Sequence, residues 1–254
     1  MSNSDPSTLP TLAILAGGLA TRLKPVSDRL PKSLVPVHGL PFVYWQLADL
    51  EERGFRDIVM LLGHRAKDVM DAVGDGSRFG VQVRYEVEPS TPPCGTGGAI
   101  VRALPGLPPV FATLYGDSLL PFDFRRPCAA FRSDNALALM TIRRAASEEQ
   151  PNAAAAGSRV ARYDKTSADR SGLGFIDYGF SVWRKEAFDP FRSESVPFDL
   201  GKVQSFCALQ GSLAAFEVTE PYYEIGSFVG IERLEKALTG GVVPSPKHIV
   251  AMRR

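Results

Sequence analysis

Short apolar runs alternate with amphipathic segments through the first half of the chain. Residues 11–16, 57–62 and 109–115 are almost wholly apolar, a pattern typical of strands buried on both faces of a parallel sheet. Residues 41–53 carry apolar side chains at helical spacing, begin with Pro41 and end before Gly54, so they predict a helix. Strands that alternate with helices in this way predict an α/β fold with a mixed, mostly parallel central sheet flanked by helices.

The same alternation continues and then changes its character. Residues 66–73 and 97–104 predict short helices, and residues 81–87 alternate apolar and polar side chains as a half-buried strand does. Beyond residue 136 strands predominate, at 136–142, 159–163, 174–183 and 214–218, with helices at 201–209 and 231–238. We therefore expect the second half to add β-rich segments to the sheet and to supply the pocket of a second substrate.

Composition and organisation are those of an ordinary globular protein. The 254 residues are 44% hydrophobic and 22% charged, with a formal net charge of +1, which favours neither nucleic acid nor an acidic membrane as partner. No linker or repeat divides the chain, so we expect a disordered segment at 1–10, a single domain at 11–240 and a C-terminal tail at 241–254. Residues 1–10 lack the apolar core of a secretory signal, and no apolar run approaches about 20 residues, which predicts a cytoplasmic protein.

The loop after the first predicted strand is rich in glycine, proline and basic residues. Gly17 and Gly18 follow the strand directly and let the backbone approach a ligand closely. Four cations come next, namely Arg22, Lys24, Arg29 and Lys32. One acidic residue lies among them. A stiff loop with glycines and several cations suits a triphosphate, although neither the GxxxxGK[ST] nor the GxGxxG motif is present. The alternative is a solvated basic loop that binds nothing.

This segment resembles the signature of the sugar-1-phosphate nucleotidyltransferases, roughly LAGGxGTRLxPxTxxxPKxxxPVxGxP. Residues 15–41 depart from it at Ala20, where the family has glycine, and at Ser27, where it has threonine. The resemblance implies the Rossmann-like nucleotidyltransferase fold. It also implies that Arg22 and Lys32 are catalytic and that the nucleotide contacts Leu15, Ala16, Gly17 and Gly18.

A second resemblance concerns the nucleotide base. Residues 85–89 (YEVEP) and 95–99 (GTGGA) are similar to the base-reading strand and glycine loop of the family, which implies that Glu88, Gly95 and Thr96 bind the nucleotide. An ionised carboxylate only accepts hydrogen bonds, and guanine offers two neighbouring donors. Glu88 therefore favours guanine, with cytosine left open. The alternative is an exposed carboxylate at the end of a strand.

Two further acidic residues resemble the metal ligands of the family. Asp117 follows the apolar run at 109–115, and Glu224 in residues 222–227 (YYEIGS) takes the place of the Asp in a (Y/F)xDxG(T/S) motif. Mg²⁺ commonly uses one or two carboxylates together with phosphate oxygens. The resemblance thus implies a Mg²⁺ cofactor held by Asp117 and Glu224, whereas a strand-end Asp taken alone is more often a turn cap.

The sugar half of the chain fits the family more loosely. Asp164 and Lys165 take the Glu-Lys positions of an EKP-like segment, and Asp177 replaces the Asn of a (V/I)NAG step. The resemblance implies that these three residues bind the sugar phosphate. The alternative is that Asp164 and Asp177 are strand-end polar residues without a ligand.

Within the family the chain most resembles the short heptose 1-phosphate guanylyltransferases. The implied reaction is GTP plus heptose 1-phosphate giving a GDP-sugar and pyrophosphate, for cell-surface polysaccharide synthesis. Mannose-1-phosphate guanylyltransferases and N-acetylmuramate-1-phosphate uridylyltransferases are alternatives. A non-catalytic nucleotide sensor on this fold and an unrelated α/β binding module are alternatives of other classes. The expected partners are a nucleoside triphosphate and a sugar 1-phosphate, without nucleic acid or membrane; a homo-oligomer is left open.

Overall fold

The computed structural model describes residues 8–18, 30–89 and 92–252. Arg22, one of the two expected catalytic residues, lies outside the described residues, as do Ala20 and Ser27. The described residues form two compact units. The first, which we call the parallel unit, comprises 11–18, 30–89, 115–123 and 220–252, and the second, the mixed unit, comprises 8–10, 92–114 and 124–219.

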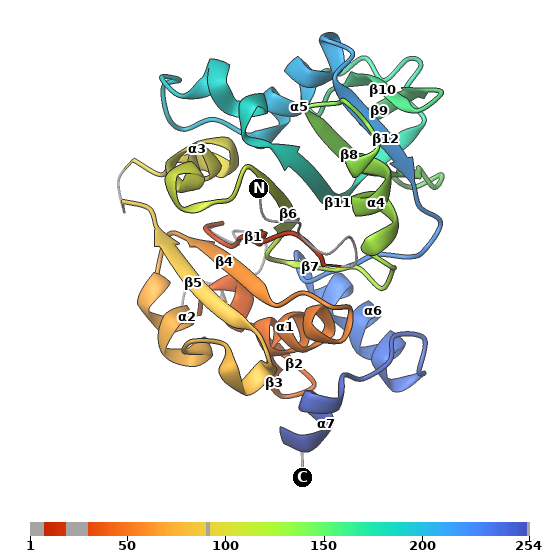
Figure 1. The fold of residues 1–254 in the computed structure, drawn as a ribbon. Coiled ribbons are helices and arrows are strands. Elements are labelled where there is room, and N and C mark those ends of the chain that lie inside the picture. The colour runs from red at the N-terminus through yellow and green to blue at the C-terminus, as the bar shows by residue number, and fades with distance from the viewer. Residues whose placement is uncertain (1–7, 19–29, 90–91, 253–254) are drawn as a thin grey trace. The chain divides into compact units, whose positions relative to one another are not determined.

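Parallel strands form the sheet of the parallel unit in the order β5-β4-β1 (Figure 1). They are β1 (Leu12–Leu15), β4 (Asp57–Leu62) and β5 (Gln82–Val87). All of β1 is buried, and so is β4 beyond Asp57, as their apolar sequences predict. The register pairs Leu15 with Leu61 and Leu62 with Val87. The carboxyl ends of all three strands therefore reach the same edge of the sheet.

Two helices connect these strands, as the sequence predicts: α1 (Phe42–Glu52) and α2 (Ala66–Val73). The helix α1 begins directly after Pro41, and Gly54 beyond its end has a φ of 102°, which glycine adopts more readily than other residues. Most of α1 is buried, including Trp45, whose indole N–H donates to the Val37 carbonyl at 2.9 Å. That bond ties α1 to the short hairpin that precedes it.

The other elements of the parallel unit are short or come from distant parts of the chain. They are η3 (Lys32–Leu34), the hairpin of β2 (Pro36–Val37) and β3 (Leu40–Pro41), η4 (Ser77–Phe79), the ladder of β7 (Ser118–Leu119) with β13 (Tyr223–Glu224), α6 (Phe228–Thr239) and α7 (Lys247–Met252). The glycine- and proline-rich segment that the sequence predicts as a loop thus contains a 3₁₀ turn at Lys32–Leu34 and leads into a hairpin. Within the expected tail, the backbone N–H of Lys247 donates to Glu52 at 2.6 Å; the expected limits of the domain stay a prediction.

The mixed unit contains a sheet in the order β6-β11-β8-β12-β10-β9. Its longest strand, β11 (Phe175–Arg184), runs antiparallel to β6 and β8, whereas β12 is parallel to β8. The other strands are β6 (Val110–Tyr115), β8 (Ala138–Arg144), β9 (Ala153–Ala156), β10 (Arg159–Tyr163) and β12 (Leu213–Glu217). The helices are α3 (Gly95–Ala103), η5 (Leu104–Gly106), α4 (Arg125–Arg132), η6 (Lys185–Phe191) and α5 (Leu200–Leu209).

An aromatic cluster forms the core of the mixed unit. The ring of Trp183 lies 5.0 Å from that of Phe188, which lies 5.9 Å from that of Phe111. The indole N–H of Trp183 donates to the hydroxyl of Thr113 at 2.9 Å, so the one polar group of this ring is satisfied inside the core. The β-rich second half and the mixed sheet flanked by helices confirm the predicted fold class.

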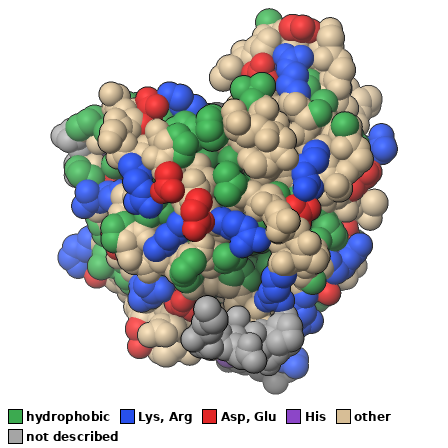
Figure 2. Space-filling view, turned by 45° about the horizontal axis from the view of Figure 1, so that its top comes forward, with side chains coloured by type: hydrophobic (Ala, Val, Ile, Leu, Met, Phe, Trp, Pro, Cys, Tyr) green, Lys and Arg blue, Asp and Glu red, His purple; other side chains and the backbone are tan. Residues whose placement is uncertain are grey.

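The surface carries charges of both signs. Lys and Arg side chains are interspersed with Asp and Glu side chains across the face shown in Figure 2, in keeping with a net charge near zero. Among the helices of the described residues, none has the length and apolar composition needed to cross a membrane.

Two glycines flank η4, and alanine at each of them is expected to lower the stability of the parallel unit by a different amount. Gly76 and Gly80 both have left-handed backbone conformations, with φ of 83° and 75°. A methyl group on Gly76 would lie 2.9 Å from the carbonyl oxygen of Val81, whereas the atoms nearest to one on Gly80 belong to the flexible side chain of Glu51. Gly80→Ala should cost about 1–2 kcal/mol of unfolding free energy, and Gly76→Ala about 1–3 kcal/mol more. Urea denaturation of both variants checks this, and equal losses would contradict it.

Candidate functional site

Backbone hydrogen bonds join several segments at the carboxyl edge of the parallel unit. The N–H of Ala16 donates to Leu61, that of Glu88 to Leu62, and that of Gly116 to Leu15, each at 2.9 Å. A Cβ on Gly116 would lie 2.8 Å from the Leu15 carbonyl oxygen, so only glycine lets this backbone come so close. Ligands of open α/β sheets bind at this edge, where the sequence predicts the nucleotide.

Lys32 and Asp117 meet at this edge. The ammonium group of Lys32 forms an ion pair with Oδ2 of Asp117, and their side chains are 22% and 28% exposed. A Cβ on Gly226 would lie 3.3 Å from Oε1 of Glu224 and 3.4 Å from Nζ of Lys32. The carboxylate of Glu224 and the ammonium of Lys32 therefore border the same space above Gly226. The structure thus brings together three residues expected to act on phosphate and metal.

A short ladder holds the two carboxylates in place. Glu224 on β13 pairs with Ser118 on β7, and the N–H of Ile225 donates to the Asp117 carbonyl at 3.0 Å. The hydroxyl of Ser118 donates to Oδ1 of Asp117 at 3.2 Å. Segments about 100 residues apart in the chain are thereby fixed side by side.

The donor set at this ladder suits Mg²⁺. Oxygen ligands from one or two carboxylates are typical of this ion, which takes its remaining ligands from water and phosphate. In the part of the chain that the structure describes, no group of three or more His, Cys, Asp or Glu side chains forms a metal cage. Asp117 and Glu224 therefore fit an ion that arrives with a phosphate better than an ion enclosed by protein alone.

Glu88 lies in a niche made by two glycines. Its Oε1 is 2.9 Å from the place where a Cβ on Gly17 would be, and a Cβ on Gly63 would collide with it. Gly17 follows β1 and Gly63 follows β4, so the carboxylate of Glu88 folds back over the ends of both strands. This is a defined position at the ligand edge and differs from the freely exposed strand-end carboxylate of the alternative interpretation.

Gly95 and Thr96 lie in the mixed unit, at the start of α3. Gly95 has a φ of 72°, and a Cβ there would lie 2.9 Å from the backbone N of Phe198. The hydroxyl of Thr96 donates to Asp199 at 3.0 Å and accepts from the N–H of Leu200 at 2.8 Å. Thr96 therefore helps to cap α5. Sequence reasoning missed Asp199, although an Asp directly before a helical segment is an N-cap signal.

Lys165 and Asp177 also come together within the mixed unit. The side chain of Asp177 is only 3% exposed and lies 3.9 Å from the ammonium of Lys165. It accepts hydrogen bonds from Tyr163 at 3.1 Å, from Gln204 at 3.2 Å and from the N–H of Gly179 at 3.0 Å. A carboxylate buried with so many donors is a fixed anchor for its neighbours, and Lys165 is the more exposed member of the pair.

Asp164 is committed to its own turn. Its Oδ1 accepts from the backbone N–H groups of Thr166 and Ser167, both at 2.9 Å. These backbone hydrogen bonds lower the pKa of Asp164 to about 2. Asn152, which sequence reasoning did not select, accepts from the Asp164 N–H through its carbonyl and from the Asp177 N–H through its side chain, both at 2.8 Å. Asp164 thus lies in a turn of its own directly after β10, the strand-end position that the alternative describes, and its role toward a sugar phosphate stays a prediction.

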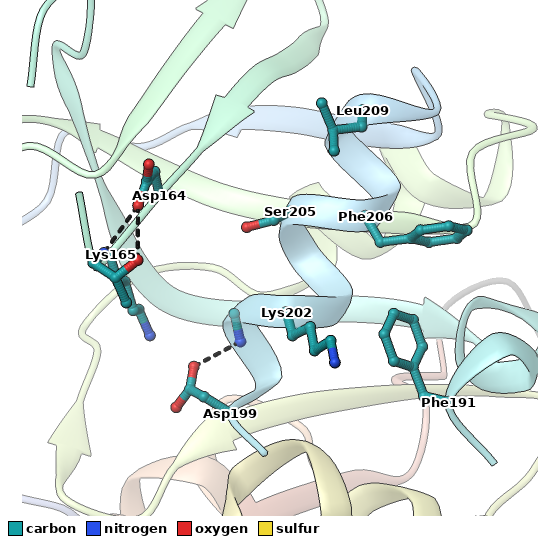
Figure 3. Close-up of a pocket in the computed structure, with 10 residues that line it drawn as sticks. Asp164, Lys165, Phe191, Asp199, Lys202, Ser205, Phe206 and Leu209 are labelled. Atoms are coloured by element: carbon teal, nitrogen blue, oxygen red, sulfur yellow. Dashed lines mark hydrogen bonds between the residues drawn. The ribbon is translucent and has the colours of Figure 1, made fainter. Parts of the chain in front are cut away.

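A pocket of about 760 Å³ opens beside these residues. Figure 3 shows Asp164 and Lys165 at one side, Ser205 and Lys202 of α5 between, and Phe191 and Phe206 at the other side. Phe191 and Phe206 meet edge to face, with ring centroids 5.5 Å apart. The pocket therefore has one polar end and one aromatic end.

Comparison with known proteins decides the family. Residues 12–152, more than half of the chain, match the family model for nucleotidyl transferases. The chain belongs to the nucleotidyl transferase family.

The relatives of this family member differ in base and sugar. It is 33% identical over 188 residues to the N-acetylmuramate alpha-1-phosphate uridylyltransferase of Neisseria meningitidis serogroup B, covering 72% of this chain and 79% of the relative. It is 28% identical over 113 residues to the D-glycero-alpha-D-manno-heptose 1-phosphate guanylyltransferase of Campylobacter jejuni, covering 44% of this chain and 50% of that relative. These relatives confirm the predicted resemblance to sugar-1-phosphate nucleotidyltransferases.

A solved structure supports the fold of this nucleotidyl transferase. The inositol-1-phosphate CTP transferase from T. maritima superposes with a TM-score of 0.77 at 18% identity, over 91% of this chain and 96% of that protein. At this identity the likeness concerns the fold alone, and it confirms the predicted nucleotidyltransferase fold. Nothing in these comparisons tests the expected site residues individually, so their roles stay predictions.

The turn at Asp164 predicts a pH dependence. Because the folded-state pKa of Asp164, about 2, lies below the ordinary value of 3.8 for an aspartate, the carboxylate contributes stability above about pH 4 that is lost as the pH falls toward 2. Asp164→Ala removes that contribution. The difference in Tm between wild type and Asp164→Ala should therefore be largest above pH 5 and shrink between pH 4 and pH 2. Thermal unfolding across that range measures it, and a difference independent of pH would contradict the assignment.

Proposed function

We propose that this protein transfers a nucleoside monophosphate from a nucleoside triphosphate to a sugar 1-phosphate and releases pyrophosphate. The observation that carries the proposal is the placing of Lys32, Asp117 and Glu224 around one space at the carboxyl edge of a parallel sheet. Membership of the nucleotidyl transferase family supports the same reaction. The product would be a nucleotide sugar made in the cytoplasm for cell-surface polysaccharides.

The proposed chemistry is a single displacement at phosphorus. An oxygen of the sugar phosphate bonds to the α-phosphorus, the bond from that phosphorus to the bridging oxygen of the β-phosphate breaks, and pyrophosphate leaves with the electron pair. The nucleophile is already anionic at neutral pH, so the reaction requires neither a protein nucleophile nor a general base. The barrier lies in bringing two anions together, and the protein lowers it by positioning and charge neutralisation.

The residues divide this task. Lys32 would neutralise charge at the α-phosphate as the nucleophile approaches. Asp117 and Glu224 would hold Mg²⁺, which when bound would supply Lewis-acid chemistry to the phosphates. Lys165 holds the incoming sugar phosphate, with Asp177 as its anchor. Arg22, outside the described residues, is assigned to the leaving group by the family motif alone. Leu15, Ala16, Gly17 and Gly18 supply backbone around the nucleotide.

For the substrates we propose GTP and heptose 1-phosphate. Glu88 supports guanine, because its carboxylate only accepts hydrogen bonds and guanine presents two donors side by side. The second candidate is UTP with N-acetylmuramate 1-phosphate. The observation that favours it is the 33% identity to an N-acetylmuramate alpha-1-phosphate uridylyltransferase, which extends over 79% of that relative.

Pyrophosphate release tests the reaction. Purified protein with Mg²⁺, the two candidate sugar 1-phosphates and each of ATP, CTP, GTP, UTP and dTTP should release pyrophosphate with GTP and heptose 1-phosphate. Asp117→Ala should abolish release, and Lys32→Ala should lower the rate on the order of 10²–10³, as loss of one strong transition-state donor does. Lys67→Ala is the matched control, because Lys67 forms an exposed ion pair with Asp71 on α2, and it should behave as wild type.

The outcomes separate the candidates. Pyrophosphate release with UTP and N-acetylmuramate 1-phosphate would support the proposed reaction and contradict the proposed substrates. Nucleotide binding without release from any pair would favour the non-catalytic sensor. Unchanged turnover in Lys32→Ala would remove the proposed role of Lys32.

The niche around Glu88 predicts a change in base preference. Glu88→Gln gains a donor and keeps an acceptor, which suits the N3–H and carbonyl of uracil or thymine. The ratio of kcat/KM for GTP to that for UTP should fall roughly tenfold or more, since hydrogen bonds to charged groups contribute about 1.5–3 kcal/mol. Glu86→Gln, on β5 two residues before Glu88, is the control. An unchanged ratio in Glu88→Gln would show that Glu88 does not read the base.

A further inference from the structure

A buried glutamine of α1 holds the turn that carries Asp117. Gln46 is 2% exposed. Its side-chain amide donates to the Tyr115 carbonyl at 3.1 Å and to the Ser118 carbonyl at 2.7 Å. These two carbonyls stand on either side of Gly116 and Asp117. The amide of Gln46 therefore donates hydrogen bonds to both ends of one four-residue turn.

Two other backbone groups of this turn have backbone partners. The N–H of Gly116 donates to the Leu15 carbonyl, and the Asp117 carbonyl accepts from the N–H of Ile225. Backbone bonds of this kind do not depend on side-chain identity. Gln46 adds side-chain hydrogen bonds at both ends of the turn, to Tyr115 and to Ser118, and the Asp117 carboxylate extends from the backbone between them.

The oxygen of the same amide lowers the stability of the folded protein. Its Oε1 is buried and has no hydrogen-bond partner within the described residues. Its neighbours Trp45 and Leu47 on α1 are fully buried apolar residues. Buried polar atoms without a partner lower stability, and proteins retain such atoms mainly where function requires the rest of the group.

We propose that Gln46 is a positioning residue, which sets the Asp117 carboxylate for the metal-bound nucleotide. The proposal rests on the proposed function of Asp117. Groups that orient a metal ligand from behind typically change metal affinity or activity by about 10–100-fold when removed. Gln46 acts through the two carbonyls and the turn between them, since its own side chain is buried beneath the turn.

The test compares two variants of α1. Gln46→Met has a similar length and no N–H donor, whereas Leu50→Ala removes a side chain that is 1% exposed on the same helix. Mn²⁺ binding in the presence of GTP is measured by electron paramagnetic resonance, Mg²⁺ activation by pyrophosphate release, and stability by Tm. We expect Gln46→Met to weaken Mn²⁺ binding about 10–100-fold and to raise the half-activating Mg²⁺ concentration in parallel. Leu50→Ala should lower Tm and leave Mn²⁺ binding within about twofold of wild type.

Gln46→His serves as a second variant that keeps one donor. It should bind Mn²⁺ with an affinity between those of wild type and Gln46→Met, and it can be compared if Gln46→Met does not fold. Wild-type affinity in either folded variant would overturn the proposal, and so would equal weakening in Leu50→Ala. If wild type binds Mn²⁺ with GTP but releases no pyrophosphate from any pair, the proposed reaction fails while the binding comparison still decides the role of Gln46. If the wild-type protein does not bind Mn²⁺ in the presence of GTP, both the proposed reaction and the proposed role of Gln46 are overturned.

Discussion

The candidate site depends on two carboxylates held side by side by the ladder of β7 and β13. Glu224 pairs with Ser118, next to Asp117, and both side chains border the ammonium of Lys32. Like charges at such a spacing repel each other unless a cation lies between them. Lys32 supplies that cation in the protein as described. A divalent ion arriving on a triphosphate can supply it instead, which would leave the Lys32 ammonium to the phosphates. The same electrostatic requirement therefore accounts for the ion pair in the structure and underlies the proposed binding of a metal-bound triphosphate.

Close backbone approach is the second constraint on this edge of the sheet. Gly116 lies against Leu15, and Gly17 and Gly63 leave the room that the Glu88 carboxylate occupies. A methyl group at any of these three glycines would displace either the turn of Asp117 or the carboxylate of Glu88. These glycines thus leave the space in which the charged groups of the site take their positions.

The sequence predicted most of the parallel unit for a simple physical reason. Strands buried on both faces must be apolar throughout, so β1 and β4 were recognisable, and Pro41 and Gly54 marked the ends of α1. The residues Lys32, Asp117 and Glu224 came from motifs, and the structure brings them together. The ladder of β7 and β13 could not be predicted, because two-residue strands have no measurable periodicity. α4, with charged residues and Pro127 in its first turn, and β9, an alanine run, also lack a clear pattern.

Partners defined only by tertiary contact were beyond the sequence as well. Gln46 and Asn152 are ordinary polar residues in the chain, and only the folded structure shows which backbone groups they hold. The turn of Asp164, in contrast, is local, because an Asp side chain can accept hydrogen bonds from backbone N–H groups two and three residues later. That commitment bears on the sugar site. With Asp164 held by its own turn and Asp177 buried among donors, Lys165 keeps the most exposed charge of the three. It is the only cation of the three and therefore the one best placed for the proposed anionic ligand, with the carboxylate of Asp177 3.9 Å from its ammonium.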